Sequence, residues 1–350
     1  MTSKHDNSGK TATNFDASVL GKHDERGNWA PHKRLECAPV FIWPVQPAAF
    51  LHWLFKRYIF SFNLIYAAVA TAFLLLLSPS AETTQTLSPG WIVYLWMRNA
   101  IAVVVFFGAW HLRLYTTRHQ GTDFKYNPQW PKTDSSVFLF RKQNVDNIIW
   151  ALASGVTIWT AFEVLMLWAH ANGIVTPLIF SENPISFMLL MLCVPAFRDL
   201  HFYCTHRLLH IPFLYKHVHK LHHYNVNPGP WSGLAMHPLE HLLYFSGVLI
   251  HFVIPAHPIH ILFQLVHAGL SPAAGHSGFD KILLDELGNE KAIDTHAYTH
   301  YLHHKHFECN YANGIIPMDK WFGTFHDGSP EAHVVMQQRR KKMSVGLGNG

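Results

Sequence analysis

Long apolar runs limit what this chain can fold into more than any other feature of its sequence. Tyr58 to Leu77 carries no charged residue, Trp91 to Trp110 carries only Arg98, and Ile148 to Ala169 carries only Glu163. A helix of about 20 apolar residues crosses the hydrocarbon core of a bilayer. The sequence therefore predicts three membrane-spanning helices and favours them over buried core helices of a soluble protein.

A fourth, shorter run and the charges of the loops predict how the chain crosses the membrane. Pro184 to Phe197 completes a crossing if Val175–Ser181 contributes to it. Residues 79–90 and 170–185 contain no Lys or Arg, whereas residues 111–143 contain six. Because positive loops stay in the cytoplasm, we expect four crossings, with the N-terminus and everything after Arg198 on the cytoplasmic side.

Composition agrees with a membrane protein, since only 14% of the 350 residues are charged against about 25% in average globular domains. The basic residues are scattered, so no nucleic-acid partner is predicted. We expect a flexible polar N-terminal tail at 1–35, an interfacial segment and membrane helices at 36–197, a histidine-rich catalytic region at 198–327, and a polar C-terminal tail at 328–350. Leu242 to Leu270 is apolar but broken by Pro255 and Pro258, which predicts a re-entrant or interfacial helical hairpin.

Histidine is the residue that points to chemistry: of 28, 19 lie between His201 and His306. Eight form three groups with helical spacing: His206 and His210; His219, His222 and His223; His300, His303 and His304. Residues three or four apart share one helix face, so each group can direct two or three imidazoles at one point. Eight imidazoles are too many for one tetrahedral zinc. They suit two adjacent metal ions, and nitrogen donors favour redox iron over calcium or magnesium.

Polar residues near these groups in sequence suit a supporting role, because metal-bound imidazoles usually donate their second N–H to an oxygen. We expect that role for Asp199, Glu240, Asp294 and Asn310. Two other functions compete. His237, Glu240 and His241 match the H-x-x-E-H pattern of zinc peptidases, although Pro238 suits its helix poorly. A histidine-lined metal transporter would instead place its ligands near the bilayer midplane.

The order of the motifs resembles the fatty acid hydroxylase/sterol desaturase superfamily, the membrane-bound histidine-box di-iron oxidases. The resemblance covers roughly residues 185–326. It rests on the three histidine groups in their order, with Asp199, Tyr203 and Arg207 around the first, and on Trp231-Ser-Gly, His237-Pro-x-Glu240, His276-Ser-Gly-Phe279, Asn310-Tyr311 and Asp319-x-x-Phe322-Gly-Thr324. It implies an all-α integral membrane protein of about four transmembrane helices, with a cytoplasmic helical cap that carries a histidine-rich di-metal site.

The resemblance also implies the chemistry and the partners. An O2-dependent enzyme with two iron ions would desaturate or hydroxylate an unactivated C–H bond of a sterol or fatty-acyl lipid. No H-P-G-G motif of a fused cytochrome b5 is present, so a separate donor such as cytochrome b5 or ferredoxin would supply electrons. The membrane would be the endoplasmic reticulum in a eukaryote or the inner membrane in a bacterium.

The ligand set that the resemblance implies is larger than eight. The family adds one or two ligands between its second and third groups, and His276 is the candidate in the H-S-G-F string. His267 and His237 are less secure candidates, followed by His241. A related fold that binds zinc and no longer catalyses also stays open, because imidazole accepts both metals.

Overall fold

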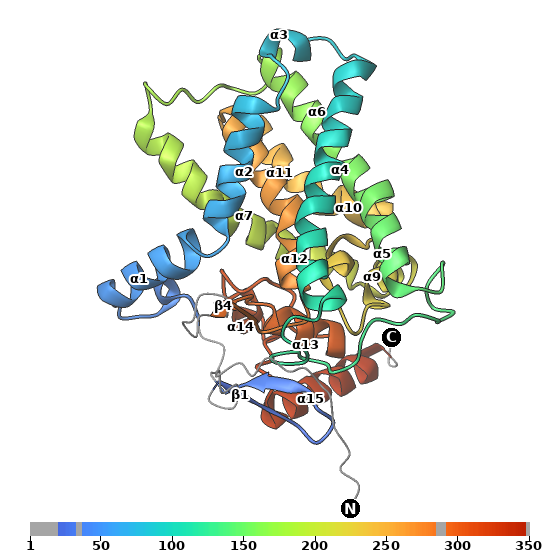
Figure 1. Ribbon diagram of the computed structural model, residues 1–350. Coiled ribbons are helices and arrows are strands. Elements are labelled where there is room, and N and C mark those ends of the chain that lie inside the picture. The colour runs from blue at the N-terminus through green and yellow to red at the C-terminus, as the bar shows by residue number, and fades with distance from the viewer. Residues whose placement is uncertain (1–19, 33–36, 285–291, 348–350) are drawn as a thin grey trace, which may run out of the picture.

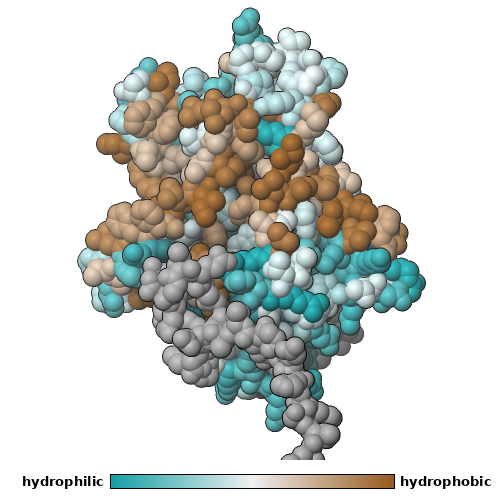
Figure 2. Space-filling view, viewed as in Figure 1, coloured by the Kyte–Doolittle hydropathy of each residue, from teal (hydrophilic) through white to brown (hydrophobic). Residues whose placement is uncertain are grey.

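Long helices fill the upper half of the molecule, whereas short helices, loops and the helix Pro330–Leu347 (α15) fill the lower half (Figure 1). The computed structural model describes residues 20–32, 37–284 and 292–347. Figure 2 shows that apolar side chains dominate the visible surface of the upper half, whereas hydrophilic side chains dominate below. The molecule is thus divided into an apolar helical part and a polar cap.

Three helical segments are long and apolar enough to cross a membrane. The first, Pro89–Thr116, consists of α4 (Pro89–His111) and the π-helical η4 (Leu112–Thr116). The second, Gln143–Ala171, consists of α5 (Gln143–Trp150), η5 (Ala151–Val156) and α6 (Thr157–Ala171). The third is α7 (Pro184–Leu209). A fourth span exists if two segments bent by 46° count as one: Pro47–Ile59 (α1, Pro47–Trp53; η3, Leu54–Ile59) and Asn63–Leu76 (α2). The prediction of about four transmembrane helices is confirmed.

Helix α7 reaches spanning length with other residues than the sequence suggested. Val175–Ser181 is not part of it, because the helix begins at Pro184. It continues instead past Phe197 to Leu209, and so carries Arg198 and His206 beyond the apolar run. One continuous helix therefore links the membrane segment to the first histidine group.

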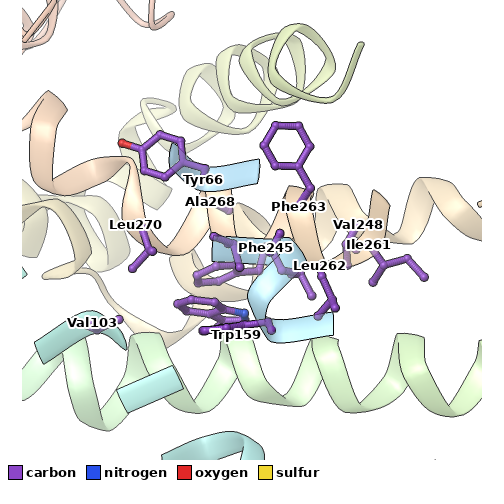
Figure 3. Close-up of a cluster of buried hydrophobic side chains, with 14 of the residues drawn as sticks. Tyr66, Val103, Trp159, Phe245, Val248, Ile261, Leu262, Phe263, Ala268 and Leu270 are labelled. Carbon is purple, nitrogen blue, oxygen red and sulfur yellow. The ribbon is translucent and has the colours of Figure 1, made fainter. Parts of the chain in front are cut away.

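The apolar run broken by Pro255 and Pro258 forms the centre of the bundle. It contains α10 (Pro238–Phe245), the 3₁₀ segment η8 (Ser246–Phe252) and α11 (Pro258–Leu270). Residues 259–270 of α11 are all buried, and α11 packs against α2, α6 and α7. Figure 3 shows this core, in which Trp159 of α6 stacks on Phe245 with ring centroids 6.3 Å apart. Helix α11 therefore lies inside the bundle, whereas the interfacial alternative predicted a segment at the membrane surface.

The two charges inside the apolar runs meet within the bundle. Arg98 of α4 and Glu163 of α6 form a buried ion pair. Asn99 Nδ2 donates to Glu163 Oε2 at 2.9 Å and to Thr160 Oγ1 at 3.1 Å. An unpaired charge in this environment is costly, so the pair lets both charged residues lie inside apolar helices.

Both predicted tails contain regular structure where they are described. Residues 20–32 include a hairpin of β1 (Gly21–His23) and β2 (Trp29–Pro31), and Trp29 packs against Phe124; residues 1–19 and 33–36 lie outside the described part. The C-terminal region forms α15 (Pro330–Leu347), so its basic run is helical. A flexible tail was predicted only for residues 1–35 and a polar tail for residues 328–350, because composition carries no information about the tertiary contacts of these segments.

The remaining elements are short and belong mainly to the cap. They are η2 (Pro39–Phe41), α3 (Ala81–Thr84), α8 (Pro212–Leu214), η6 (Tyr215–His219), α9 (Lys220–His223), η7 (Pro230–Leu234), α12 (Pro272–Gly275), β3 (Lys281–Leu283) paired with β4 (Ala292–Asp294), α13 (Tyr298–His306) and α14 (Met318–Trp321).

Candidate metal centre

Nine histidines form two adjoining clusters beneath the bundle. The first cluster is His206, His210, His219, His223 and His303, and the second is His222, His276, His300 and His304. Within each cluster, one nitrogen from every ring lies within 4.8 Å of the others. The clusters touch, since the rings of His223 and His304 are 5.0 Å apart. All eight histidines singled out by spacing are present, and His276 joins them.

Each H-x-x-H-H motif contributes to both clusters. His219 and His223 are four residues apart and enter the first cluster, whereas His222 enters the second. In α13 the assignment is reversed: His300 and His304 enter the second cluster and His303 the first. The sequence predicted that each motif directs its imidazoles at one point. Residues four apart instead share one cluster, while the third lies on the side facing the other cluster.

Backbone carbonyls fix which nitrogen carries the proton in four of the rings. The Nδ1 atoms of these rings face carbonyl oxygens as follows: His206 to Tyr311 at 2.8 Å, His222 to Ala235 at 3.3 Å, His276 to Pro272 at 3.0 Å and His303 to Cys309 at 2.6 Å. A carbonyl only accepts hydrogen bonds, so each neutral ring carries its proton on Nδ1. The Nε2 lone pairs therefore point into the clusters.

The spacing of these lone pairs fits a shared cation. His222 Nε2 and His276 Nε2 are 3.3 Å apart, and His300 Nε2 lies 2.8 Å from the latter. Two unprotonated nitrogens this close repel each other unless a cation lies between them. Nitrogens that share a metal at about 2.0–2.1 Å stand roughly 3.0–3.4 Å apart. The donor set is thus that of a transition-metal site.

Burial keeps these imidazoles neutral. It lowers the pKa of His222 to about 4, and it lowers the pKa values of His219, His223, His300, His303 and His304 well below the ordinary value. Neutral imidazole is the form that binds metals. The clusters are therefore ready to bind cations at neutral pH without releasing protons from their rings.

Glu240 is the acidic group that supports a cluster directly. Its Oε1 lies 2.7 Å from Nδ1 of His219, and both side chains are buried. Burial raises the pKa of Glu240 well above its ordinary value, because the charged form of a buried carboxyl is poorly solvated. A cation on Nε2 of His219 would favour the carboxylate and would orient the ring through it.

The other predicted supporting residues lie in different surroundings. Asp199 accepts hydrogen bonds from the backbone N–H groups of Asn313 and Ile316, at 2.8 and 2.7 Å. Asn310 bonds to the backbone of His326. Asp294 pairs with Lys281 at 3.2 Å and contacts no cluster histidine among the described residues. These side chains hold loops of the cap, and Glu240 alone among the four predicted residues bonds to a cluster imidazole.

Three further histidine candidates lie outside both clusters. His267 Nε2 donates to Asn63 Oδ1 at 2.9 Å, because the amide nitrogen of Asn63 is already bonded to the Tyr58 carbonyl. His237 caps the N-terminus of α10, and His241 bonds to Ser154 and to the Leu234 carbonyl. His237, Glu240 and His241 therefore do not converge as a peptidase site would require.

The carbonyl acceptors are the part of the site that sequence reasoning missed. Helix α13 ends at His306, and the chain reverses through Phe307, whose φ is 67°. This turn brings the carbonyls of Cys309 and Tyr311 against His303 and His206. Every residue has a carbonyl, so residue type gave no signal. The Asn310-Tyr311 motif was the nearest indication of this loop.

A third group of histidines lacks the arrangement of the two clusters. His306, His326 and His333 offer nitrogens within 4.8 Å of one another. However, Nδ1 of His326 accepts from the Gly328 N–H at 3.0 Å, so its neutral ring carries the proton on the other nitrogen. Its Nδ1 lone pair is already engaged, unlike the Nε2 lone pairs of the four cluster histidines whose Nδ1 atoms face backbone carbonyls.

One cavity connects the clusters with the apolar helices. Its wall includes His206, His222 and His300 from the two clusters. It also includes Trp53 and Tyr58 of the bent first span, together with residues of α2, α7 and α11. A lipid in this cavity would contact both the metal site and the helices of the apolar half.

Comparisons with known proteins match the same region. Residues 188–324 match the model of the Fatty acid hydroxylase family. A Delta(7)-sterol 5(6)-desaturase of Gibberella zeae is 34% identical over 43% of this chain and 46% of its own length. Methylsterol monooxygenase 1 of Gallus gallus is 34% identical over 48% of this chain and 56% of its own. The matches thus span about half of each relative, and no solved structure matches the chain.

Proposed function

We propose that this chain, whose residues 188–324 match the Fatty acid hydroxylase family, is a member of the fatty acid hydroxylase/sterol desaturase superfamily and an O2-dependent di-iron lipid oxidase. The observation that carries the proposal is the pair of touching, all-imidazole clusters with inward lone pairs. An all-nitrogen neutral donor set suits redox iron, and two ions side by side suit O2 chemistry. Bound iron would supply the activation of O2 that breaks an unactivated C–H bond.

The residues of this chain then have separate roles. The nine cluster histidines would hold the ions, with His276 completing the second cluster. Glu240 and the carbonyls of residues 235, 272, 309 and 311 would hold the rings in orientation. The surrounding apolar walls would exclude water, which protects a strong oxidant from side reactions.

We propose a sterol or related lipid as the substrate. The relatives are named for sterol desaturation and methylsterol oxidation, and the cavity joins the clusters to helices of the apolar half. A lipid could therefore bring its target carbon to the ions along an apolar path. Desaturation and hydroxylation begin with the same hydrogen abstraction, so both belong to the proposal.

The proposal includes a partner and an orientation. A separate protein such as cytochrome b5 or ferredoxin would deliver electrons. The loop charges favour the cytoplasmic face for the clusters, and the membrane would be the endoplasmic reticulum of a eukaryote or the inner membrane of a bacterium. There they are within reach of soluble reductases and of lipid still in the bilayer.

Metal content tests the proposal directly. We expect the detergent-purified full chain, expressed with added iron, to carry about two irons. His303→Ala removes one first-cluster ligand and should lose most of that iron and all lipid oxidation. His217→Ala, an exposed histidine in the same stretch as His219, is the control and should keep both. One zinc per chain, or metal unchanged in His303→Ala, would contradict the di-iron assignment.

A further inference from the structure

Four polar side chains that belong to neither histidine cluster lie in the wall of the cavity, and three of them are buried. Tyr66 of α2 and His267 of α11 line the cavity, and their rings meet edge to face at 5.0 Å. Arg198 and Tyr244 line it too, and the guanidinium donates to the Tyr244 hydroxyl. These four side chains come from four helices, α2, α7, α10 and α11, so the fold gathers them in one place.

Two polar atoms of this group have no hydrogen-bond partner within the described residues. They are the Tyr66 hydroxyl and Nδ1 of His267, and both side chains are more than nine-tenths buried. Figure 3 shows the Tyr66 hydroxyl pointing away from the other labelled side chains of the core. Leaving buried polar atoms unpaired costs free energy, so such atoms in a cavity wall indicate a polar group on the ligand.

The hydrogen bonds around the group define what that ligand group must be. His267 Nε2 donates to Asn63, which leaves the Nδ1 lone pair as an acceptor. The Tyr66 hydroxyl is free to donate. Tyr244 already donates to the Ala268 carbonyl at 2.9 Å. A ligand hydroxyl can donate to His267 and accept from Tyr66 at once, whereas a carboxylate or sulfate would meet the His267 lone pair with its own.

We propose that Tyr66 and His267 form a subsite that recognises the ring hydroxyl of a sterol-like substrate. This rests on the proposed function, which supplies a lipid in the cavity. Arg198 lies close to the subsite without an ion-pair partner within 4.0 Å among the described residues, and it adds a positive field that favours the oxygen end of the ligand. The subsite would fix which ring carbon faces the metal ions.

Binding of matched sterols tests the subsite without turnover. The probes are tritiated 5α-cholestan-3β-ol, its hydrocarbon 5α-cholestane and its 3-sulfate, each measured on the detergent-purified full chain. We expect the alcohol to bind at least tenfold more tightly than the hydrocarbon. Tyr66→Phe keeps the ring and removes one hydrogen bond, so it should reduce that preference about three- to tenfold. Hydrocarbon binding by this variant should not change, which also shows that it is folded.

The controls separate the subsite from general effects. Tyr58 also lines the cavity, but its hydroxyl already donates to the Leu192 carbonyl at 2.5 Å, so Tyr58→Phe should leave the alcohol-to-hydrocarbon ratio unchanged. Equal affinity for alcohol and hydrocarbon, or tightest binding of the sulfate, would overturn the subsite even if the protein oxidises lipids. A preserved ratio in a protein that oxidises no lipid would support the subsite and refute the proposed function.

Discussion

At the scale of single residues, Glu240 differs from the other groups that orient the clusters. Four imidazoles are held by neutral carbonyls, whereas His219 faces a carboxyl group. The position of the proton in the Glu240–His219 pair therefore depends on whether a cation is bound on the far side of the ring. Replacing Glu240 would therefore change the net charge at the first cluster without removing any of its histidines.

Glu240→Gln should weaken iron binding about 10- to 100-fold. The glutamine oxygen can still accept from His219 Nδ1, so the ring stays oriented, but the negative charge that balances the cation is lost. Competition with a chelator of known affinity measures the change. Asp294→Asn changes a carboxylate that pairs with Lys281, and it should bind iron as the parent does. Equal affinities for all three proteins would show that Glu240 is only a packing residue.

Acid should destabilise the metal-free protein. Burial holds the pKa of His222 at about 4, while an unfolded histidine has a pKa of about 6.5. As pH falls below about 6.5, this histidine binds a proton in the unfolded chain but stays neutral in the folded chain. The free energy of unfolding therefore has its full value above about pH 6.5 and decreases as pH falls towards 4. The other cluster imidazoles outside the membrane helices add in the same direction. Thermal unfolding of iron-depleted protein from pH 7.5 to 5 measures this, and a constant midpoint would contradict it.

The histidines that form the clusters could be predicted from sequence, but the groups that orient their rings could not. Helical spacing selected eight histidines, and all eight lie in the clusters. Spacing could not separate His276 from His267, because both follow the second motif and only tertiary packing places the latter against Asn63. The carbonyl acceptors were inaccessible for a different reason, since they depend on backbone turns such as the one at Phe307.

At the scale of elements, α11 packs tightly on α6 where Gly269 meets Trp159. A Cβ built on Gly269 would lie 2.2 Å from the Trp159 ring, and Trp159 is completely buried. The two helices can be this close only because one of them has no side chain at the contact. This contact holds the central helix beside the membrane-spanning helices.

Gly269→Ala should lower the free energy of unfolding by about 1–3 kcal/mol, because the Trp159 ring must move within a packed core. Gly108→Ala is the matched control. Gly108 lies in α4, and a Cβ there meets nothing within 4 Å. Because alanine has the better helix propensity, Gly108→Ala should leave the free energy of unfolding unchanged or raise it by up to about 1 kcal/mol. Thermal unfolding in one detergent compares them. Equal loss in both variants would mean that the contact is not tight.

Periodicity and length predicted the long helices well. They did not predict the positions of segments that are set by tertiary contacts. The apolar runs correspond to α2, α4, α6 and α7, which span either alone or together with the helical segments that adjoin them. The proline-broken run gave no such indication, and α11 is buried because its neighbours surround it. The C-terminal segment was predicted only as a polar tail, and contacts such as the hydrogen bond from Arg339 to the Gly323 carbonyl (2.5 Å) depend on tertiary structure.

At the scale of the whole molecule, the loop charges and the arrangement of the helices together predict which parts of the chain lie on each side of the membrane. In Figure 1, α3 lies at the end of the bundle opposite to α13 and α15. The loop between α4 and α5 lies towards the cap end. Spans that connect these two ends would put them on opposite sides of a bilayer.

Single cysteines should therefore label from opposite sides. With the four native cysteines replaced by serine, Glu82→Cys beside α3 should react with a membrane-impermeant maleimide from outside intact cells or sealed microsomes of lumen-out orientation. Thr133→Cys, in the loop after α4, should react only from the cytoplasmic side. Both positions are exposed. Labelling of both from the same side would refute the four-crossing arrangement.

The division of ligands between the two clusters has a consequence for biosynthesis. The first cluster needs both His206 and His303, and the second needs both His222 and His304. The last donor of each cluster is therefore synthesised well after the first. A nascent chain could not hold either proposed ion fully until His303 and His304 have been added. Iron supply would then act after these residues are synthesised, and a cell short of iron would accumulate inserted but incompletely assembled protein for its membrane proteases to remove.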